Sequence, residues 1–190
     1  HRLTRMKASK SGRREVTIDE ATHRKALAGV HKRVRLVLSI LWHTGMRPEE
    51  VREFSAKHWR PATGQLVFPN AKGDRPRVVR LGPCMQTLAR ILTHFRPEGP
   101  VLVSQRGRKP WTVNSIRCQF RSMRAKGLIP AGATAYSYRH TYITDALEKG
   151  FSTSAVAELA GHNDATMIAK HYGHLEQRGG MLDAAAIAVR

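Results

Sequence analysis

The strongest constraint on the fold is an apolar face between positions 34 and 42. Its members recur at the spacing of one side of an α-helix: Val34, Val37, Leu38, Leu41 and Trp42. Gly45 is placed to end this helix, and Pro48 suits the first position of the next one. Because such a face must be covered by other elements, the sequence predicts a buried helix in a packed core.

The rest of the chain is mainly helical by pattern, with one small sheet. Thr17-Ile18-Asp19-Glu20 has the form of a capping box that starts a helix over 21–28. Further helices are expected over 85–95, 112–126, 137–149, 153–160 and 164–172, with a last apolar helix over 181–189. Runs at 65–68 and 77–81 flank a turn at Lys72-Gly73-Asp74, which predicts antiparallel strands.

Positive charge dominates the composition. The 190 residues include 33 Lys and Arg against 14 Asp and Glu, a formal charge of +19, and 41% of the residues are hydrophobic. That hydrophobic content excludes a disordered basic tail. The charge favours a polyanionic partner, because each cation near a phosphate releases condensed counterions. DNA, RNA and anionic lipid all fit this description, and a solvated charged face is the ordinary alternative.

Several classes of protein are not expected. Cys84 and Cys118 stand apart with no Cys-x-x-Cys, which suits reduced thiols in a cytosolic protein rather than a disulfide framework. No apolar run has membrane-spanning length, so no membrane partner is expected. His171 and His174 are spaced i, i+3, but no His-Glu-x-x-His or carboxylate cluster completes a metal site.

The first residues differ in composition from the rest. They contain six basic residues and no acid: Arg2, Arg5, Lys7, Lys10, Arg13 and Arg14. Such a segment is typical of a flexible arm that binds phosphates. The chain opens with His1 rather than Met, which favours a piece of a longer protein. We therefore expect a basic linker over 1–14 and one compact domain over 15–190.

Five short blocks carry the functional signal. They are Thr44-Gly45-Met46-Arg47-Pro48-Glu49-Glu50, then Asn70-Ala71-Lys72-Gly73-Asp74 with Arg77-Val78-Val79-Arg80-Leu81, then Tyr138-Arg139-His140-Thr141, Ala160-Gly161-His162 and Lys170-His171-Tyr172-Gly173-His174-Leu175. Each block is weak alone. In this order and spacing, over roughly residues 15 to 178, the set resembles the tyrosine recombinases, the phage-integrase family of site-specific DNA recombinases.

The resemblance implies a fold, a substrate and an assembly. The fold would be the α+β, mainly helical catalytic domain of the family, with a small antiparallel sheet on one edge. The substrate would be double-stranded DNA, cut without cofactor or metal by a homo-oligomer, a tetramer, on paired sites. The apolar tail at 181–189 would dock on a neighbouring subunit. The helical core-binding domain that usually precedes this one is expected to be absent, and the location would be a prokaryotic cytoplasm, on the nucleoid.

The residues themselves suit transesterification at a phosphodiester. Attack by a hydroxyl builds charge on the non-bridging oxygens, and preorganised donors stabilise that charge. Arg47 and Arg139 fit because a guanidinium binds two oxygens in a fixed fork at any physiological pH. Either alone would read as a surface or salt-bridged arginine, for example with Arg47 paired to Glu50. We interpret Glu50 as structural support for the helix start beneath Arg47.

Tyr172 is the expected nucleophile, forming a 3′-phosphotyrosine intermediate. A free phenol titrates near ~10, so it needs cations nearby to ionise as it attacks. Tyr138 and Tyr142 are spaced i, i+4 and are expected to be packing residues, whereas Tyr172 follows His162 in the matching context. Lys72 would be the general acid for the leaving 5′ hydroxyl, and His162 would hydrogen-bond the phosphate. A solvated turn lysine and a helix-end histidine are the alternatives.

One position departs from the family. A histidine commonly stands three positions before the second arginine, where this chain has Tyr136. A phenol can donate a hydrogen bond to phosphate, but it does not become a cation near neutral pH. Tyr136 is therefore included in the catalytic set as a neutral donor.

A basic stripe and two other functions complete the expectations. Arg117, Arg121, Arg124 and Lys126 repeat every three or four residues, as a phosphate-binding stripe or a solvated face would. Residues 154–172, with Gly161 in the turn, also read locally as a helix-turn-helix, which would make the protein a non-catalytic DNA-binding module. A type IB topoisomerase-like relaxing activity would share the chemistry.

Overall fold

The computed structural model describes residues 16–69, 76–104, 109–161 and 166. In order, the elements of this part are α1 (Glu20–Gly29), α2 (Lys32–Thr44), α3 (Pro48–Glu53), η1 (Ala56–His58), β1 (Trp59–Arg60), β2 (Gln65–Phe68), β3 (Arg77–Arg80), α4 (Pro83–Phe95), α5 (Val113–Ala125), α6 (Ala135–Glu148) and α7 (Thr153–Ala160). The expected arm at 1–14, the turn at 72–74, the helix at 164–172 and the tail at 181–189 lie outside the described residues.

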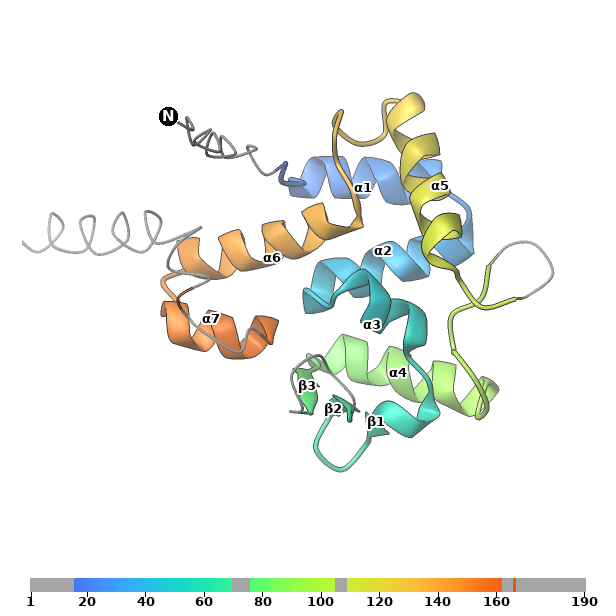
Figure 1. The fold of residues 1–190 in the computed structure, drawn as a ribbon, viewed down its shortest axis with the longest axis vertical. Helices are drawn as coiled ribbons and strands as arrows, with labels where there is room; N and C mark the ends of the chain where they lie inside the picture. Colours follow the sequence, from blue (N-terminus) through green and yellow to red (C-terminus); the bar gives the residue numbers. More distant parts are fainter. Residues whose placement is uncertain (1–15, 70–75, 105–108, 162–165, 167–190) are drawn as a thin grey trace, which may run out of the picture.

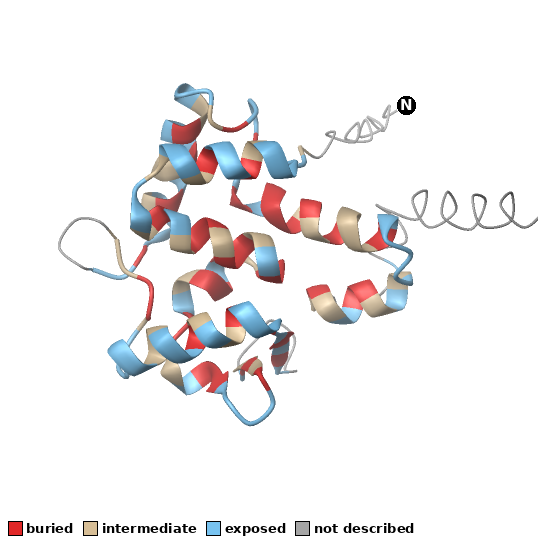
Figure 2. Ribbon diagram, turned by 180° about the vertical axis from the view of Figure 1, so that it is seen from behind, coloured by how far each residue is buried: buried red, intermediate tan, exposed pale blue. Residues whose placement is uncertain are grey.

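Helix α2 occupies the middle of the molecule. Figure 1 shows α1, α5 and α6 on one side of α2 and α3, and α4 with the small sheet on the other. Seen from behind, α2 and α6 turn mainly buried residues toward each other (Figure 2). Val34, Val37, Leu38 and Leu41 are buried as predicted, while Trp42 is half-buried and stacks on the ring of His23. The apolar face therefore forms the centre of the core.

The turn between α2 and α3 follows the sequence signals closely. Gly45 adopts the left-handed conformation, with φ of 59°, and its N–H donates to the Leu41 carbonyl. A residue with a side chain is strained there, which explains the glycine. Pro48 is the first residue of α3, where its missing N–H costs nothing. This tight turn fixes the direction in which Arg47 leaves the core.

The capping box predicted at Thr17 is wrong. Asp19 is the N-cap of α1, and its side chain accepts a hydrogen bond of 2.7 Å from the Thr22 N–H. Ile18, just before it, is fully buried and donates its N–H to the Thr141 hydroxyl at 2.8 Å. Because this contact with α6 keeps Ile18 in the core, the helix begins only after Asp19.

The sheet has three antiparallel strands in the order β1-β2-β3. Strands β2 and β3 match the two predicted runs, although β3 ends at Arg80, and β1 was not predicted as a separate strand. In β3, Arg77 and Val79 are buried while Val78 and Arg80 are exposed. This alternation turns Arg77 inward, toward α7, which contacts β3.

The remaining predicted helices are present with small shifts at their ends. Helix α4 begins at Pro83, two residues before the predicted start, and α6 begins at Ala135 after the N-cap Thr134. Helix α7 has the predicted bounds and ends at Gly161, with φ of 67°. The fold class is therefore confirmed: α+β, mainly helical, with a small antiparallel sheet at one edge (Figure 1).

Candidate active site

Three arginines from three different elements meet at the C-terminal end of α7. The carbonyls that they bind are those of Glu158, Leu159, Ala160 and Gly161. Arg77 binds the first two, Arg139 the third, and Arg47 the fourth, at 2.7 Å. The last carbonyls of a helix lack partners within it and form the negative end of its dipole. The end of α7 is thus a template that holds the guanidiniums together.

Glu50 supplies the one carboxylate among the described contacts of this arginine cluster. Its two oxygens accept hydrogen bonds from the Arg47 guanidinium at 2.9 Å and from the Arg47 backbone N–H at 2.8 Å. The Nε of Arg77 lies 3.5 Å from Glu50 Oε1. The pairing of Arg47 with Glu50 therefore exists, and it orients Arg47 at the start of α3 while the other end of the guanidinium reaches α7.

Arg139 lies at the bottom of the cluster. Only 4% of it is exposed, and its Nη1 donates to the Gly45 carbonyl at 2.8 Å. This bond ties α6 to the turn between α2 and α3, so Arg139 and Arg47 are held by the same turn and the same helix end. Burial and the neighbouring Arg47 lower the pKa of Arg139 to about 10, which still leaves the guanidinium charged at neutral pH.

The cluster has an excess of positive charge. Arg47, Arg77 and Arg139 carry three charges against the single charge of Glu50. A third of the Arg47 side chain is exposed, whereas 3% of the Arg77 side chain is. Within the described part of the chain, the bonds of Arg47 and Arg139 leave several of the five guanidinium N–H donors of each for a ligand. Such a site suits an anion that approaches from the Arg47 side.

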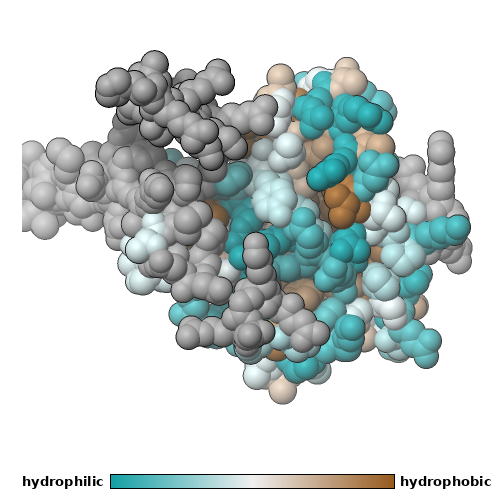
Figure 3. All heavy atoms as spheres, in the orientation of Figure 1, coloured by the Kyte–Doolittle hydropathy of each residue, from teal (hydrophilic) through white to brown (hydrophobic). Residues whose placement is uncertain are grey.

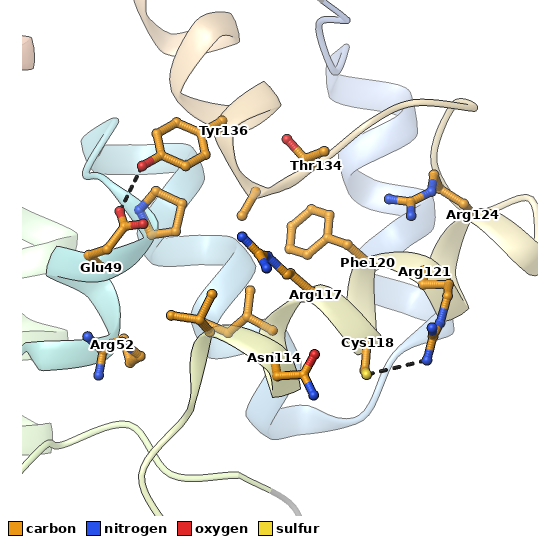
Figure 4. Close-up of a pocket in the computed structure, with 14 residues that line it drawn as sticks. Glu49, Arg52, Asn114, Arg117, Cys118, Phe120, Arg121, Arg124, Thr134 and Tyr136 are labelled. Atoms are coloured by element: carbon orange, nitrogen blue, oxygen red, sulfur yellow. Dashed lines mark hydrogen bonds between the residues drawn. The ribbon is translucent and has the colours of Figure 1, made fainter.

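Tyr136 stands beside this cluster on the first turn of α6. Its phenol donates a hydrogen bond of 2.9 Å to Glu49 of α3, and 43% of the residue is exposed. Burial and the hydrogen bond to Glu49 raise the pKa of the Tyr136 phenol. Figure 4 shows the pair at the edge of a pocket between α3, α5 and α6. The phenol is therefore a neutral donor at physiological pH.

The four basic residues predicted to form a stripe on α5 differ in their exposure and contacts. Arg117, Arg121 and Arg124 line a pocket of about 520 Å³ that Tyr136 also lines (Figure 4). Arg117 and Arg121 are exposed, but Arg124 is half-buried and donates to the Ala133 carbonyl at 2.6 Å. Lys126 lies at the C-cap, beyond the last helical residue. Arg117, Arg121 and Lys126 are therefore exposed, as phosphate ligands would be, and Arg121 also contacts the Cys118 sulfur at 3.5 Å.

The other tyrosines of α6 are packing residues, as expected. Tyr138 is fully buried, with its ring edge-on to Phe120 and Trp42. The ring of Tyr142 lies against Gly45, where an added Cβ would come within 2.4 Å of it.

Several expected site residues lie outside the described residues: Lys72, His162, His171, Tyr172 and His174. His162 directly follows Gly161, whose carbonyl Arg47 binds. Among the residues that the structure describes, no group of three or more His, Cys, Asp or Glu is placed to hold a metal ion.

Arg77 is the site residue that sequence reasoning missed. Arg77 stands in the second of the five blocks, but the sequence assigned it no role in the site. The signal was its parity with Val79 and Leu81, both of which are buried. Since alternate residues of a strand face the same side, this spacing indicated an inward guanidinium.

Polar side chains are prominent on one face of the molecule. On the face drawn in Figure 3, hydrophilic side chains cover most of the described surface. Within the described residues, no helix is long and apolar enough to cross a bilayer.

Comparison with known proteins places the chain in a family. Residues 16–178 match the Phage integrase family. The tyrosine recombinase XerD of Staphylococcus aureus is 30% identical over 139 residues, which cover 70% of this chain and 47% of that protein. The tyrosine recombinase XerC of Bradyrhizobium diazoefficiens is 25% identical over 162 residues, covering 80% of this chain and 49% of that protein. The chain thus spans about half the length of the curated relatives that it matches.

Solved structures share the fold. The XerH site-specific recombinase in a post-cleavage complex with its palindromic difH substrate superposes with a TM-score of 0.69 at 20% identity, over 97% of this chain and 56% of that one. The catalytic domain of bacteriophage HP1 integrase gives a TM-score of 0.59 at 21% identity, over 84% and 88% of the two chains. With the family match extending over most of its length, the chain belongs to the phage integrase family, the tyrosine recombinases.

Proposed function

We propose that this chain is the catalytic part of a site-specific DNA recombinase that cuts and rejoins DNA through Tyr172. The observation that carries the proposal is the convergence of Arg47 and Arg139 on adjacent carbonyls at the end of α7, directly before His162. Family membership supports it, since curated relatives are named tyrosine recombinases.

The reaction is a direct exchange of phosphodiester bonds. The Tyr172 phenol loses its proton to solvent as its oxygen attacks the scissile phosphorus, and the bond from phosphorus to the 5′ oxygen breaks. The tyrosine becomes esterified to the 3′ phosphate, and the 5′ oxygen leaves as a hydroxyl after taking a proton from Lys72. Attack by a 5′ hydroxyl of a partner strand reverses the step. The bond energy stays in the phosphotyrosine, so rejoining needs no nucleotide cofactor.

Charge is the main contribution of the arginine cluster. A phosphodiester carries one negative charge, and attack by an ionising phenol brings a second to the transition state. The cluster offers an excess of two positive charges, three arginines against Glu50. Because α7 and Glu50 hold Arg47 and Arg139 before DNA arrives, the donors need no reorganisation during the reaction.

Tyr136 adds a neutral donor beside the two arginines. Its phenol bonds to Glu49 in this structure, 2.9 Å away. A DNA phosphate oxygen in the same place would accept that hydrogen bond instead. Tyr136 can thus donate a hydrogen bond from the position where the family commonly has histidine, but it does not become a cation near neutral pH.

DNA would be held by exposed cations around the pocket. Arg117 points toward Tyr136 across the pocket, and Arg121 lies further along α5 beside Cys118, so both could contact backbone phosphates (Figure 4). Solved relatives are described as recombinases bound to DNA substrates. We propose that several copies, a tetramer in all, act on paired sites in the cytoplasm, with 1–14 as the linker to a separate DNA-clasping domain and 15–190 as the catalytic domain.

A nicked suicide substrate tests the proposed function. Wild-type protein and Tyr172→Phe are incubated with a pool of nicked duplexes whose central sequence is randomised, and adducts are isolated on denaturing gels and sequenced. We expect a covalent adduct from the wild type, and binding without adduct from the variant. An adduct from Tyr172→Phe would exclude Tyr172 as the nucleophile. Binding without adduct by the wild type would favour the helix-turn-helix-like module, and relaxation of a plasmid lacking any selected site would favour a topoisomerase.

A further inference from the structure

Arg77 contributes charge to the arginine cluster, but the chemistry above gives it no contact with the phosphate. We propose that Arg77 is a positioning residue, which sets the places of Arg47 and Arg139 by binding Glu50 and the last turn of α7 from beneath. The inference rests on the proposed function for its consequence, but its geometry stands apart from it.

The contacts of Arg77 point inward rather than toward a ligand. Its Nη2 donates to the Leu159 carbonyl at 2.7 Å, and its Nη1 to the carbonyls of Val78 and Glu158 at 2.7 and 3.3 Å. With 3% of its side chain exposed, Arg77 is far less accessible than Arg47. Arg139 is equally buried, but it makes two carbonyl bonds among the described residues, whereas Arg77 makes three and also lies beside Glu50.

Arg77 shares one acceptor with Arg47, and it binds carbonyls adjacent to those that Arg47 and Arg139 bind. Its Nε lies 3.5 Å from the Glu50 oxygen that accepts from the Arg47 guanidinium. The carbonyls of 158 and 159 that it binds are followed directly by those of 160 and 161, which Arg139 and Arg47 bind. Moving Arg77 would therefore move the acceptors that fix the other two guanidiniums.

The Arg77 side chain also packs closely against the backbone of Gly161. A Cβ added at Gly161 would lie 2.4 Å from the Cδ and Nε of Arg77, so the side chain passes directly beneath the residue before His162. Glycine at 161 serves two purposes: it adopts the left-handed conformation that ends α7, and it leaves room for the guanidinium.

A buried cation at position 77 does not by itself favour the folded state. Burial lowers the pKa of Arg77, which shows that the surroundings disfavour its charge. An apolar side chain of similar volume would avoid that penalty, yet it would leave two carbonyls at the end of α7 without a donor. The planar fork of Arg77 donates to two carbonyls of α7, and its charge lies 3.5 Å from the Glu50 carboxylate as an ion pair.

The test compares Arg77→Met and Arg77→Lys with the matched control Arg80→Ala. Arg80 lies on the same strand and makes an exposed ion pair of 3.5 Å with Glu158 of the same helix. Two quantities are measured on a duplex selected by the wild type: the DNA dissociation constant and the rate of adduct formation at saturating DNA. The Nε–Hε signals of Arg47 and Arg139 are followed by nuclear magnetic resonance without DNA.

Displaced guanidiniums should slow chemistry more than binding. We expect Arg77→Met to reduce the rate about 100-fold, the order found when reacting groups are misplaced by 1 Å. Its dissociation constant should stay within about twofold, because affinity comes mainly from phosphate contacts elsewhere. Arg77→Lys, which keeps the charge but not the fork, should fall between. Arg80→Ala should change neither quantity by more than about twofold, since surface ion pairs contribute little.

A double-mutant cycle between Arg77 and Glu50 gives a second test of the positioning role. If Arg77 acts through that carboxylate, the double variant Arg77→Met with Glu50→Gln should lose much less than the product of the two single losses. Fully multiplicative losses would show that the two residues act independently and would overturn the proposal.

The spectra separate this inference from the proposed function. Unmoved Arg47 and Arg139 signals in Arg77→Met would overturn the positioning role whatever the adduct assay gives. Parallel losses of rate and affinity in the folded Arg77→Lys would assign Arg77 to binding, and would also overturn it. Displaced signals together with a wild type that forms no adduct would refute the recombinase function and leave the positioning role standing.

Discussion

The protein holds arginines in two contrasting ways. At the end of α7, Arg47, Arg77 and Arg139 are fixed by carbonyls and one carboxylate, and two of the three are almost fully buried. On α5, the exposed Arg117 and Arg121 line a pocket, with Arg121 contacting only the Cys118 sulfur among the described residues (Figure 4). The first group is prepared before a ligand arrives, whereas the second must be ordered by it.

In the proposed function, the fixed arginines at α7 act in catalysis and the exposed arginines of α5 attract DNA. Exposed cations interact with DNA through water and salt, which screen charges beyond about 10 Å at 0.1 M ionic strength. Fixed and buried donors act at short range, where the dielectric is low, and they favour the geometry of a transition state. We therefore expect changes in the arginine cluster to alter rates and changes on α5 to alter affinity.

The largest effect is expected for Arg139→Lys. A lysine cannot bind the Gly45 and Ala160 carbonyls and a phosphate together, so the rate of adduct formation should fall about 1,000-fold, the upper range for losing one preorganised donor. The control is Arg124→Lys, since Arg124 has one carbonyl acceptor among the described contacts, that of Ala133. Single-turnover assays at saturating DNA measure both. Similar losses in the two variants would remove the distinction between the groups.

Gly161→Ala should disturb the cluster through the backbone. The left-handed conformation costs a residue with a Cβ about 1 to 2 kcal/mol, and here the Cβ also meets Arg77. We expect about 2 to 3 kcal/mol less unfolding free energy in urea and a rate reduced by tens of fold. Gly150→Ala is the matched control, because Gly150 has φ of 83° but no atom within 4 Å of an added Cβ. An unchanged rate in Gly161→Ala would contradict the expectation.

Tyr136 lies where the two regions meet, and its replacement tests protonation. The pKa of the phenol is raised, so it stays neutral and adds no pH dependence between pH 5 and 8. In Tyr136→His the imidazole, with an ordinary pKa near ~6.5, becomes a cation as the pH falls below that value. The adduct rate at low pH should therefore rise up to about tenfold relative to the rate at pH 8. Tyr136→Phe should show no such rise, and identical profiles for Tyr136→His and wild type would be the contrary result.

The smallest effect on rate is expected for Arg117→Gln and Arg121→Gln. Each variant should lower the slope of log affinity against log salt by about 0.9 if one phosphate contact is lost. The rate at saturating DNA should stay unchanged. Arg90→Gln serves as control, since Arg90 is exposed on α4, away from the pocket. Fluorescence anisotropy over a salt series gives the slopes, and a loss of rate without a change in slope would place these arginines with the buried cluster.

Local signals predicted most of the fold. Gly45 and Pro48 act within a few residues of their position, so the turn between α2 and α3 was readable from the sequence. The start of α1 was not, because the choice of Asp19 over Thr17 depends on the bond between Ile18 and Thr141. That contact joins residues 123 positions apart, beyond the reach of a local pattern.

The sequence predicted Arg47 and Arg139 as members of the site, but not the groups that hold them in place. Arg47, Glu50 and Arg139 belong to short motifs, and the structure places all three at one cluster. The role of α7 as a carbonyl template could not be read, because backbone groups leave no mark in a sequence. The hydrogen bond from Tyr136 to Glu49 also could not be predicted from the sequence, because it requires α3 and α6 to pack side by side.

The order of the arginines along the chain has a consequence for synthesis on the ribosome. Arg47 is translated early, yet the carbonyl that orients it lies 114 positions later, at the end of α7. A growing or truncated polypeptide that stops before α7 carries the guanidiniums without the helix end that gathers them. The arginine cluster can thus form only after α7 has been made.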